Sequence, residues 1–226
     1  MMTNLSLRQQ KIVDATKKFD VTCDVGCDHG YIGVELLKNK KTNFLIASDI
    51  SEKSVKKAEN LLKAENLLEF ASIKVCDGLR AIDENVDQII IAGMGGKEIA
   101  HILSEYRNIK NTKYFVFQPM NELVFFRKFL EKINLKIKKD FIVFDKKFYH
   151  IITAENGEFK LTDFQSKWGY KPKERNSDYF LWLDKKEEKI KNIVTKLPKY
   201  NEKSEKFLKC LSEIKKIKKT KGARKC

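Results

Sequence analysis

The chain has 226 residues, of which 42% are hydrophobic, and it carries a formal net charge of +15. This composition excludes an intrinsically disordered protein, and no apolar run approaches the roughly 20 residues that span a membrane. The opening residues contain no apolar core of a secretion signal, so we expect a cytoplasmic protein. The charge favours a polyanionic partner, nucleic acid first, although a lysine-rich coding bias would give the same excess.

The cysteines and histidines show no pattern of a metal site or a disulfide framework. The five cysteines include no C-x-x-C pair, and the three histidines are not spaced with them as zinc ligands. Cys23 and Cys27 lie around an apolar run, where cysteine behaves as a small hydrophobic residue. We therefore expect reduced thiols and no bound metal.

Residues 1–158 alternate short apolar runs with amphipathic segments. A leading helix is expected within residues 5–19. Buried strands are expected at 20–25, 43–50, 71–78, 86–96 and 113–119, followed by two strands joined by a turn within 135–155. Helices are expected at 31–38, 51–68, 97–106 and 121–133. The alternation predicts an α/β fold, with a parallel sheet covered by helices on both faces.

The pattern changes after residue 158. A connector leads to a helix expected over 179–197 and, after a break at Pro198, to a last helix expected over 202–219. Each helix carries an apolar seam, which predicts an antiparallel, coiled-coil-like helical hairpin. We therefore expect two domains, the α/β domain at 1–158 and a basic helical hairpin at 159–226.

The loop after the first strand reads D-V-G-C-D-H-G-Y-I-G from Asp24 to Gly33. Gly26 and Gly30 permit a ligand to approach the backbone closely, as in the G-x-G-x-x-G loop of dinucleotide-binding proteins. Asp28, however, lies where that loop receives a phosphate, and two like charges about 4 Å apart repel by about 4 kcal/mol at an effective dielectric of about 20. The loop therefore argues against NAD or FAD. It suits a cofactor with a ribose and a positive charge but no phosphate, namely S-adenosylmethionine.

Two further acids end the next two strands. Asp49 follows Gly30 by 19 residues, the place where an acid accepts hydrogen bonds from ribose hydroxyls. Asp77, followed by Gly78, could hold the exocyclic amine of adenine. Because parallel strands end at one edge of a sheet, these acids should meet the first loop and the G-M-G-G stretch after the fourth strand. Any one acid could instead be a turn or N-cap residue, but their succession favours a ligand site.

Five segments in succession, DVGCDHGYI, ASDI, DGL, IAGMGG and FQP, resemble the bacterial tRNA adenine N1-methyltransferases that act on position 22 of tRNA. The resemblance covers nearly the whole chain, and D-H-G together with G-M-G-G is its most specific part. It implies a Rossmann-like class I methyltransferase fold, S-adenosylmethionine as donor and N1 of an adenine in tRNA as acceptor. The chain departs from the family at Met120, where asparagine is usual. Asn121 follows directly, and whether it substitutes is open.

The expected site residues fall into two groups. Asp28, His29 and Gln118 are the candidates for catalysis at the rim of the site, where Gln118 could hydrogen-bond the edge of the base. His29 could equally serve to shape the loop. The expected cofactor-binding residues are Asp24, Gly26, Asp28, Gly30, Asp49, Ile50, Asp77, Gly78, Gly93 and Met94.

Other functions share parts of this pattern. A methyltransferase for another RNA or for a small molecule would keep the cofactor site without needing a basic hairpin. A non-catalytic RNA-binding protein on the same fold would not need Asp24, Asp28, Asp49 and Asp77, which are all present. A nucleotide-dependent dehydrogenase is disfavoured by Asp28. For the leading function we expect tRNA as the partner, gripped through its phosphates by the basic residues of 199–226, and a monomeric enzyme.

Overall fold

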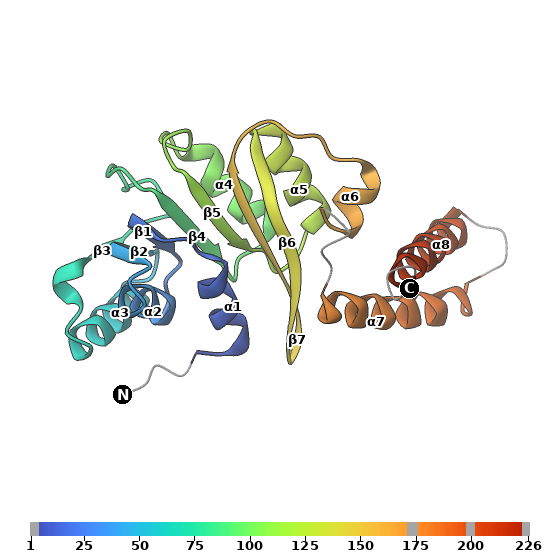
Figure 1. Cartoon of the computed structure of the whole chain (residues 1–226), viewed down its shortest axis with the longest axis horizontal. Helices are drawn as coiled ribbons and strands as arrows, with labels where there is room; N and C mark the ends of the chain where they lie inside the picture. The colour runs from blue at the N-terminus through green and yellow to red at the C-terminus, as the bar shows by residue number, and fades with distance from the viewer. Residues whose placement is uncertain (1–4, 171–175, 198–201, 223–226) are drawn as a thin grey trace. The chain divides into compact units, whose positions relative to one another are not determined.

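The structure is a computed structural model, and it describes residues 5–170, 176–197 and 202–222. The chain divides into two compact units, residues 1–171 and 172–226. The first unit contains the sheet with its covering helices, and the second contains the last two helices (Figure 1).

A seven-stranded sheet with strand order β3-β2-β1-β4-β5-β7-β6 forms the centre of the first unit. The five strands β1 to β5 pair in parallel, which confirms the predicted α/β fold. The last two strands are the pair joined by a turn that was predicted within residues 135–155. β6 and β7 form a hairpin that turns at Lys146, so β7 lies antiparallel to both β5 and β6. The strands are β1 (Phe19–Val25), β2 (Thr42–Asp49), β3 (Ala71–Val75), β4 (Gln88–Ala92), β5 (Tyr114–Gln118), β6 (Leu135–Asp145) and β7 (Lys147–Asn156).

Helices cover both faces of this sheet. Side chains alternate between the faces along β4, where Ile90 packs with Ile12 and Val13 of α1. Ile89 and Ile91 point to the opposite face and pack with α4 and α5. The helices of this unit are α1 (Leu7–Ala15), α2 (Tyr31–Lys38), α3 (Glu52–Ala64), the 3-10 turn η1 (Leu68–Phe70), α4 (Gly96–Glu105), α5 (Leu123–Lys132) and α6 (Asp163–Trp168).

α6 is a helix within the segment that we expected to be a connector. Thr162 caps it by accepting a hydrogen bond from the backbone N–H of Gln165, whose side chain in turn accepts one from the Thr162 N–H. This capping box is written in the sequence as T-D-F-Q, but a helix of six residues is too short to show a hydrophobic period. Trp168 at its end is buried.

The second unit consists of α7 (Ser177–Val194) and α8 (Glu202–Gly222), which confirms the predicted pair of C-terminal helices. Leu183 of α7 and Ile214 and Ile217 of α8 are buried. Lys218 of α8 forms an ion pair with Glu187 of α7. The coiled-coil character of the pair stays a prediction. In the part of the chain that the structure describes, no helix has the length and apolarity to cross a membrane.

Candidate functional site

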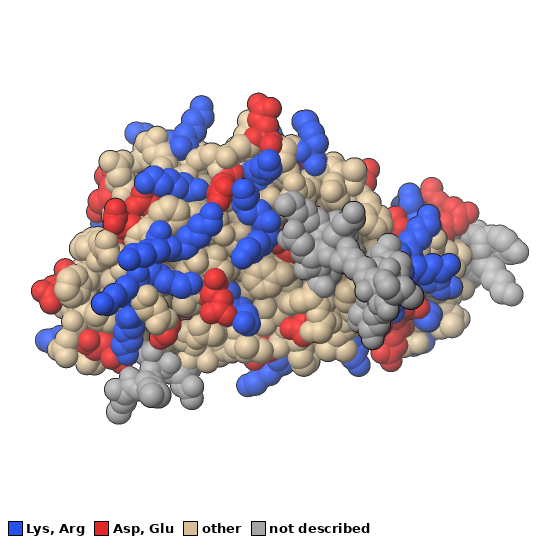
Figure 2. All heavy atoms as spheres, viewed as in Figure 1, with Lys and Arg blue, Asp and Glu red and all other residues tan. Residues whose placement is uncertain are grey.

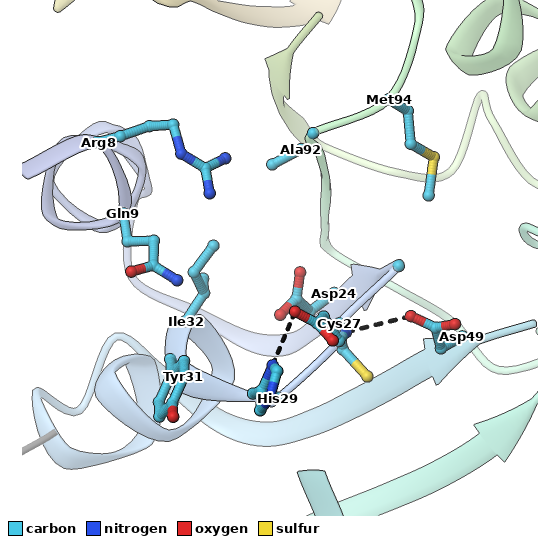
Figure 3. Close-up of a pocket in the computed structure, with 13 residues that line it drawn as sticks. Arg8, Gln9, Asp24, Cys27, His29, Tyr31, Ile32, Asp49, Ala92 and Met94 are labelled. Atoms are coloured by element: carbon cyan, nitrogen blue, oxygen red, sulfur yellow. Dashed lines mark hydrogen bonds and ion pairs between the residues drawn. The ribbon is translucent and has the colours of Figure 1, made fainter. Parts of the chain in front are cut away.

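A pocket of about 310 Å³ lies where the parallel strands β1, β2 and β4 end. The thirteen residues that line it come from α1, the loop between β1 and α2, the start of α2, and the ends of these strands (Figure 3). The structure therefore brings together segments that are far apart in the sequence. The predicted site residues that line it are Asp24, Gly26, Asp28, His29, Asp49, Gly93 and Met94.

The loop after β1 is shaped by Gly26. Its φ of 72° lies in the left-handed region, and a Cβ atom at this position would stand 2.3 Å from Cε of Met94. Glycine thus adopts the left-handed conformation of the loop and leaves room for the end of the Met94 side chain. The backbone N–H groups of Gly26 and Cys27 both donate to the carbonyl oxygen of Ser48, at 2.8 and 3.0 Å. These bonds hold the loop against β2, beside the pocket.

Asp24, the second-last residue of β1, presents a buried carboxylate to the pocket. The residue is 3% exposed, and its side chain forms no hydrogen bond or ion pair with any described residue. Burial, reinforced by the negative charge of Asp49, raises the pKa of Asp24 to about 7. A buried carboxylate without a partner is costly, and a cationic ligand would relieve that cost.

Asp49, at the end of β2, is partly satisfied by the backbone. Its Oδ2 accepts a hydrogen bond from the N–H of Asp28 at 3.1 Å, and its Oδ1 accepts one from the N–H of Ser51 at 2.9 Å. Because an ionised carboxylate can accept about four hydrogen bonds, Asp49 retains capacity for two hydroxyl donors. It both anchors the loop and remains available to a ligand.

Asp28 and His29 form the outer rim of the pocket. Nδ1 of His29 lies 2.8 Å from Oδ2 of Asp28, and the His29 ring stacks on Tyr31 with 5.5 Å between centroids. The Asp28 and His29 side chains are 65% and 40% exposed, so a molecule entering the pocket can reach both. Contacts with Asp28 and Tyr31 therefore orient the imidazole of His29. This orientation is compatible both with a catalytic role and with a role in shaping the loop.

Arg8 and Gln9 line the pocket from α1, and sequence reasoning missed both. Nη1 of Arg8 donates to Oε1 of Gln118 at 2.7 Å, and its guanidinium carbon lies 5.3 Å from the centroid of the Tyr149 ring. The only local signal is the capping box between Ser6 and Gln9, which starts α1 at this point. That signal locates the helix but does not reveal what the helix faces.

The remaining predicted residues lie outside the pocket lining. Gln118 is fully buried, and its amide contacts Arg8 and Sδ of Met120. Asp77 forms an ion pair with Arg80 at 2.7 Å. Ile50 is 72% exposed directly after Asp49. Gly30 and Gly78 both have positive φ and allow close packing, Gly30 against Ala58 and Gly78 against Ile102.

Met120 and Asn121, where the sequence differs from the usual pattern of the family, contact the loop after β4 and the start of α4. Oδ1 of Asn121 accepts a hydrogen bond from the N–H of Gly96 at 3.2 Å, so Asn121 supports the start of α4. Met120 is 42% exposed, and its backbone N–H donates to the carbonyl oxygen of Met94 at 2.9 Å. The Gln-Pro-Met-Asn segment therefore joins the ends of β4 and β5 beside the pocket.

No group of three or more His, Cys, Asp or Glu side chains in the described residues could hold a metal ion. The thiols of Cys23, Cys27 and Cys76 form no disulfide with any described residue.

The strand order, with an antiparallel strand between β5 and β6, and the acids at the ends of β1 and β2 define the methyltransferase class of Rossmann-like folds. Residues 5–152 match the family of the methyltransferase domain, and the chain belongs to that family. The match includes every strand that borders the pocket.

Comparison with known proteins confirms the resemblance found in the motifs. The chain is 31% identical over 157 residues to the tRNA (adenine(22)-N(1))-methyltransferase of Bacillus subtilis (strain 168), covering 68% of this chain and 66% of that protein. The chain spans 61–66% of the length of the curated relatives it matches. A crystal structure of a Streptococcus pneumoniae protein, described as a candidate tRNA (m1A22) methyltransferase, superposes with a TM-score of 0.89 and 27% identity, covering 94% of this chain and 99% of that one. A second structure of that protein, in complex with S-adenosyl-L-methionine, gives a TM-score of 0.85 over the same shares, also at 27% identity.

Proposed function

We propose that this protein is an S-adenosylmethionine-dependent methyltransferase that methylates N1 of adenine 22 in tRNA, in the cytoplasm. The observation that carries the proposal is the acidic pocket at the strand ends, in which Asp24 is buried without a partner. The likeness of the chain to proteins that are named for this reaction supports the choice of substrate.

The residues of the pocket fit this cofactor. The α-ammonium group of its methionyl end would supply the cation that Asp24 lacks, and its ribose hydroxyls would supply donors to Asp49. Ile50 offers an exposed apolar side chain beside Asp49 for the face of the adenine ring. Asp77, two residues after the end of β3, forms an ion pair with Arg80 and would accept a hydrogen bond from the adenine amine with the same carboxylate.

The chain's part in the reaction is mainly to position the base. The bound cofactor supplies a methyl group that its sulfonium charge has already activated. Adenine N1 has an in-plane lone pair, so no side chain needs to remove a proton before attack, and alignment supplies most of the catalysis. The methylated base is a cation, which the carboxylate of Asp28 at the rim would stabilise electrostatically. His29, held by Asp28 and Tyr31, would border the base.

N1 lies on the Watson–Crick edge of adenine, so the base must leave its stack to enter the pocket. The protein must then hold the rest of the tRNA through its phosphates. Figure 2 shows lysine and arginine side chains crowded on the face in view, with fewer acids among them. In the first unit, Lys17 and Lys138 share the single carboxylate of Glu155. In the second unit, Lys215 and Lys216 of α8 are exposed.

The direct test incubates the purified protein with labelled S-adenosylmethionine and an unmodified tRNA transcript that carries adenine 22. We expect label in N1-methyladenosine, and no label in a transcript with guanine at that position. Label in another nucleoside would favour a different RNA methyltransferase. Binding of the tRNA without any transfer would favour the non-catalytic RNA-binding protein.

A second test concerns the basic helices. Reversing two charges in Lys215→Glu/Lys216→Glu should weaken tRNA binding and reduce its salt dependence, because each lost phosphate contact lowers the salt slope by about one. Affinity for S-adenosylmethionine should stay unchanged. Unchanged tRNA affinity would show that Lys215 and Lys216 contact no phosphate of the tRNA.

A further inference from the structure

The β6–β7 hairpin extends beyond the edge of the sheet at which the pocket lies. β5 and β7 are paired as far as Phe117 opposite Ile152, and β5 ends at Gln118. The hairpin continues from Ile152 to its turn at Lys146. At about 3.3 Å per residue, its tip therefore projects roughly 15 Å past the end of β5 (Figure 1). The packing of the sheet does not require a projection of this length.

The tip of the hairpin adjoins the pocket through α1. The backbone N–H of Arg8 donates to Oδ2 of Asp145 at 3.0 Å, and the guanidinium carbon of Arg8 lies 5.3 Å from the centroid of the Tyr149 ring. Arg8 itself lines the pocket. Residues at the base of the turn thus contact a residue that a molecule in the pocket can reach. The tip therefore borders the mouth of the pocket on the side of α1.

The tip is an ordered part of the sheet rather than a loose loop. The ladder between β6 and β7 continues to the pair Asp145 and Lys147, directly before and after the turn. Phe144 and Phe148 face each other in this ladder, with 4.9 Å between their ring centroids. Cross-strand aromatic pairs of this kind stabilise a hairpin, so the side chains of the tip have defined positions. Nζ of Lys147 lies 5.3 Å from the centroid of the Tyr149 ring, which orients this ammonium as well.

Positive charge exceeds negative charge at this tip. Lys146 and Lys147 are both exposed, and neither forms an ion pair with an acid of the described chain. With Arg8 they make three cations around one acid, Asp145, whose carboxylate already accepts the backbone hydrogen bond of Arg8. The tip is therefore suited to bind an anion.

The other side of the pocket has the opposite charge. Asp28 and Asp49 line it from the loop after β1 and from the end of β2. Figure 3 shows Arg8 and Asp49 on opposite sides of the pocket. When a nucleotide leaves its stack, its base enters the site while its two flanking phosphates stay at the mouth. The acids repel these phosphates, so the backbone of the RNA should run along the side of the hairpin.

We propose that Lys146 and Lys147 bind the phosphates that flank the nucleotide whose base enters the pocket. The assignment rests on the proposed function, because it presupposes an RNA substrate. It gives the hairpin a role in positioning. The two lysines hold the backbone of the target nucleotide on one side of the mouth, and the base can then turn towards the acidic side, where Asp28 is exposed.

The first test removes both charges in Lys146→Gln/Lys147→Gln. Glutamine is unbranched at Cβ like lysine, which suits position 146, where φ is 61°. Binding of an unmodified tRNA transcript with adenine 22 is measured by fluorescence anisotropy over a series of salt concentrations. We expect affinity to fall about 10- to 100-fold at about 0.1 M salt and the salt slope to decrease by about two, one for each phosphate contact. Affinity for S-adenosylmethionine should stay within about threefold.

The second test locates the contact on the RNA. A tRNA ligated from synthetic halves carries methylphosphonates, which are uncharged, at the two phosphates that flank adenine 22. The wild-type protein should bind this tRNA about 10- to 100-fold more weakly than the unmodified one. Lys146→Gln/Lys147→Gln should lose little further affinity, because the two changes remove the same contacts. Losses that simply add would place the lysines on other phosphates and overturn the assignment.

Lys40→Gln/Lys110→Gln is the matched control. Both lysines are exposed, and they precede β2 and β5, so they lie towards the edge of the sheet opposite the pocket. The control removes the same charge from the protein and should bind the tRNA within about threefold of the wild type. If it lost as much affinity as the hairpin variant, long-range charge rather than contacts at the tip would be responsible, and the assignment would fail.

The outcomes separate this assignment from the proposed function. A wild-type protein that methylates adenine 22, together with a hairpin variant of unchanged tRNA affinity and salt slope, would overturn the assignment alone. An equal loss of affinity for tRNA and for S-adenosylmethionine in the variant would indicate a damaged pocket and also count against it. Wild-type protein that bound no tRNA would overturn the proposed function, and the assignment with it.

Discussion

Two carboxylates lie buried in the same sheet, Asp24 on β1 and Asp140 on β6, and their surroundings differ. The side chain of Asp140 is 2% exposed and accepts hydrogen bonds from Nε and Nη2 of Arg127, at 2.8 and 3.1 Å, and from the N–H of Tyr170 at 2.8 Å. Burial alone would raise the pKa of Asp140, but the charge and hydrogen bonds of Arg127 outweigh it and lower that pKa.

Asp24 is as deeply buried but has no partner among the described residues, and its pKa rises to about 7. Asp140 connects β6 to Arg127 of α5, whose Nη1 also donates to the carbonyl oxygen of Ser166 in α6. The two acids are therefore alike in burial and differ in their partners. Asp140 is satisfied by Arg127 and by the backbone of Tyr170, whereas Asp24 has no partner among the described residues.

The largest effect is expected from removing the partner of Asp140. Arg127→Met leaves a buried carboxylate unpaired, which should lower the free energy of unfolding by about 3–5 kcal/mol. Urea unfolding at neutral pH measures this change. The double variant Arg127→Met/Asp140→Leu should recover part of it, because no charge then remains buried.

Arg80→Met is the matched control for Arg127. Its ion pairs with Asp77 and Glu105 lie at the surface, where such pairs contribute little, so the unfolding midpoint should barely change. If Arg127→Met behaved like this control, the Asp140 network would not stabilise the fold, and the contrast with Asp24 would fail.

The sequence predicts where Asp24 and Asp49 lie, but it does not predict the burial and pairing of Asp140. Asp24 and Asp49 follow apolar runs at recognisable strand ends, so topology alone places both at one edge of the sheet. Asp140 lies in the polar stretch K-I-K-K-D, and its burial depends on Arg127. Arg8 depends in the same way on Gln118, 110 residues further along the chain. Contacts of this kind arise from tertiary packing, which no local pattern encodes.

The second prediction concerns the stability of the ligand-free protein. The folded pKa of Asp24, about 7, lies above the ordinary value of 3.8, so between these values the folded state binds more protons than the unfolded state. The contribution of Asp24 to the free energy of unfolding is therefore greatest below about pH 4, and it falls as the pH rises to about 7. Asp24→Asn removes this loss and should stabilise the protein at pH 8 by up to about 4 kcal/mol, with a smaller gain at pH 5.

Thermal unfolding of both proteins at pH 5 and pH 8, without ligand, measures the difference. A variant less stable than the wild type at pH 8 would show that the ionised Asp24 has a stabilising partner in the protein. Asp24 would then resemble Asp140, as a buried carboxylate that groups within the protein stabilise.

The third prediction is the pH dependence of binding. An ammonium group beside Asp24 favours its ionised form, so affinity for S-adenosylmethionine should fall as the pH drops below about 7. The expected loss is up to about tenfold per pH unit, one proton being displaced on binding. Calorimetric titrations at pH 5.5, 6.5 and 7.5 test this, with 5′-methylthioadenosine as the ligand that should show no such slope. Asp24→Asn should bind weakly and without the slope.

Asp49 is intermediate between the two acids, because two backbone N–H groups satisfy it in part. Asp49→Asn keeps one acceptor oxygen, so we expect about a tenfold loss of affinity, the value of one hydrogen bond to a charged group. The ribose is common to S-adenosylmethionine and 5′-methylthioadenosine, and both should be affected equally. A loss confined to S-adenosylmethionine would assign Asp49 to the amino-acid end of the ligand instead.

The smallest effect is expected at Asp77, the acid that is exposed and already paired with Arg80. A bond to the adenine amine would replace part of a surface ion pair, and such pairs contribute little. Asp77→Asn should therefore lower affinity for S-adenosylmethionine by no more than about fivefold in the same titration, and Arg80→Gln, which frees the carboxylate, should not lower it. A loss near a hundredfold for Asp77→Asn would mean that an acid paired in the ligand-free protein can matter as much as an unpaired one. The partners of a carboxylate would then no longer separate the binding acids of this sheet from the structural ones.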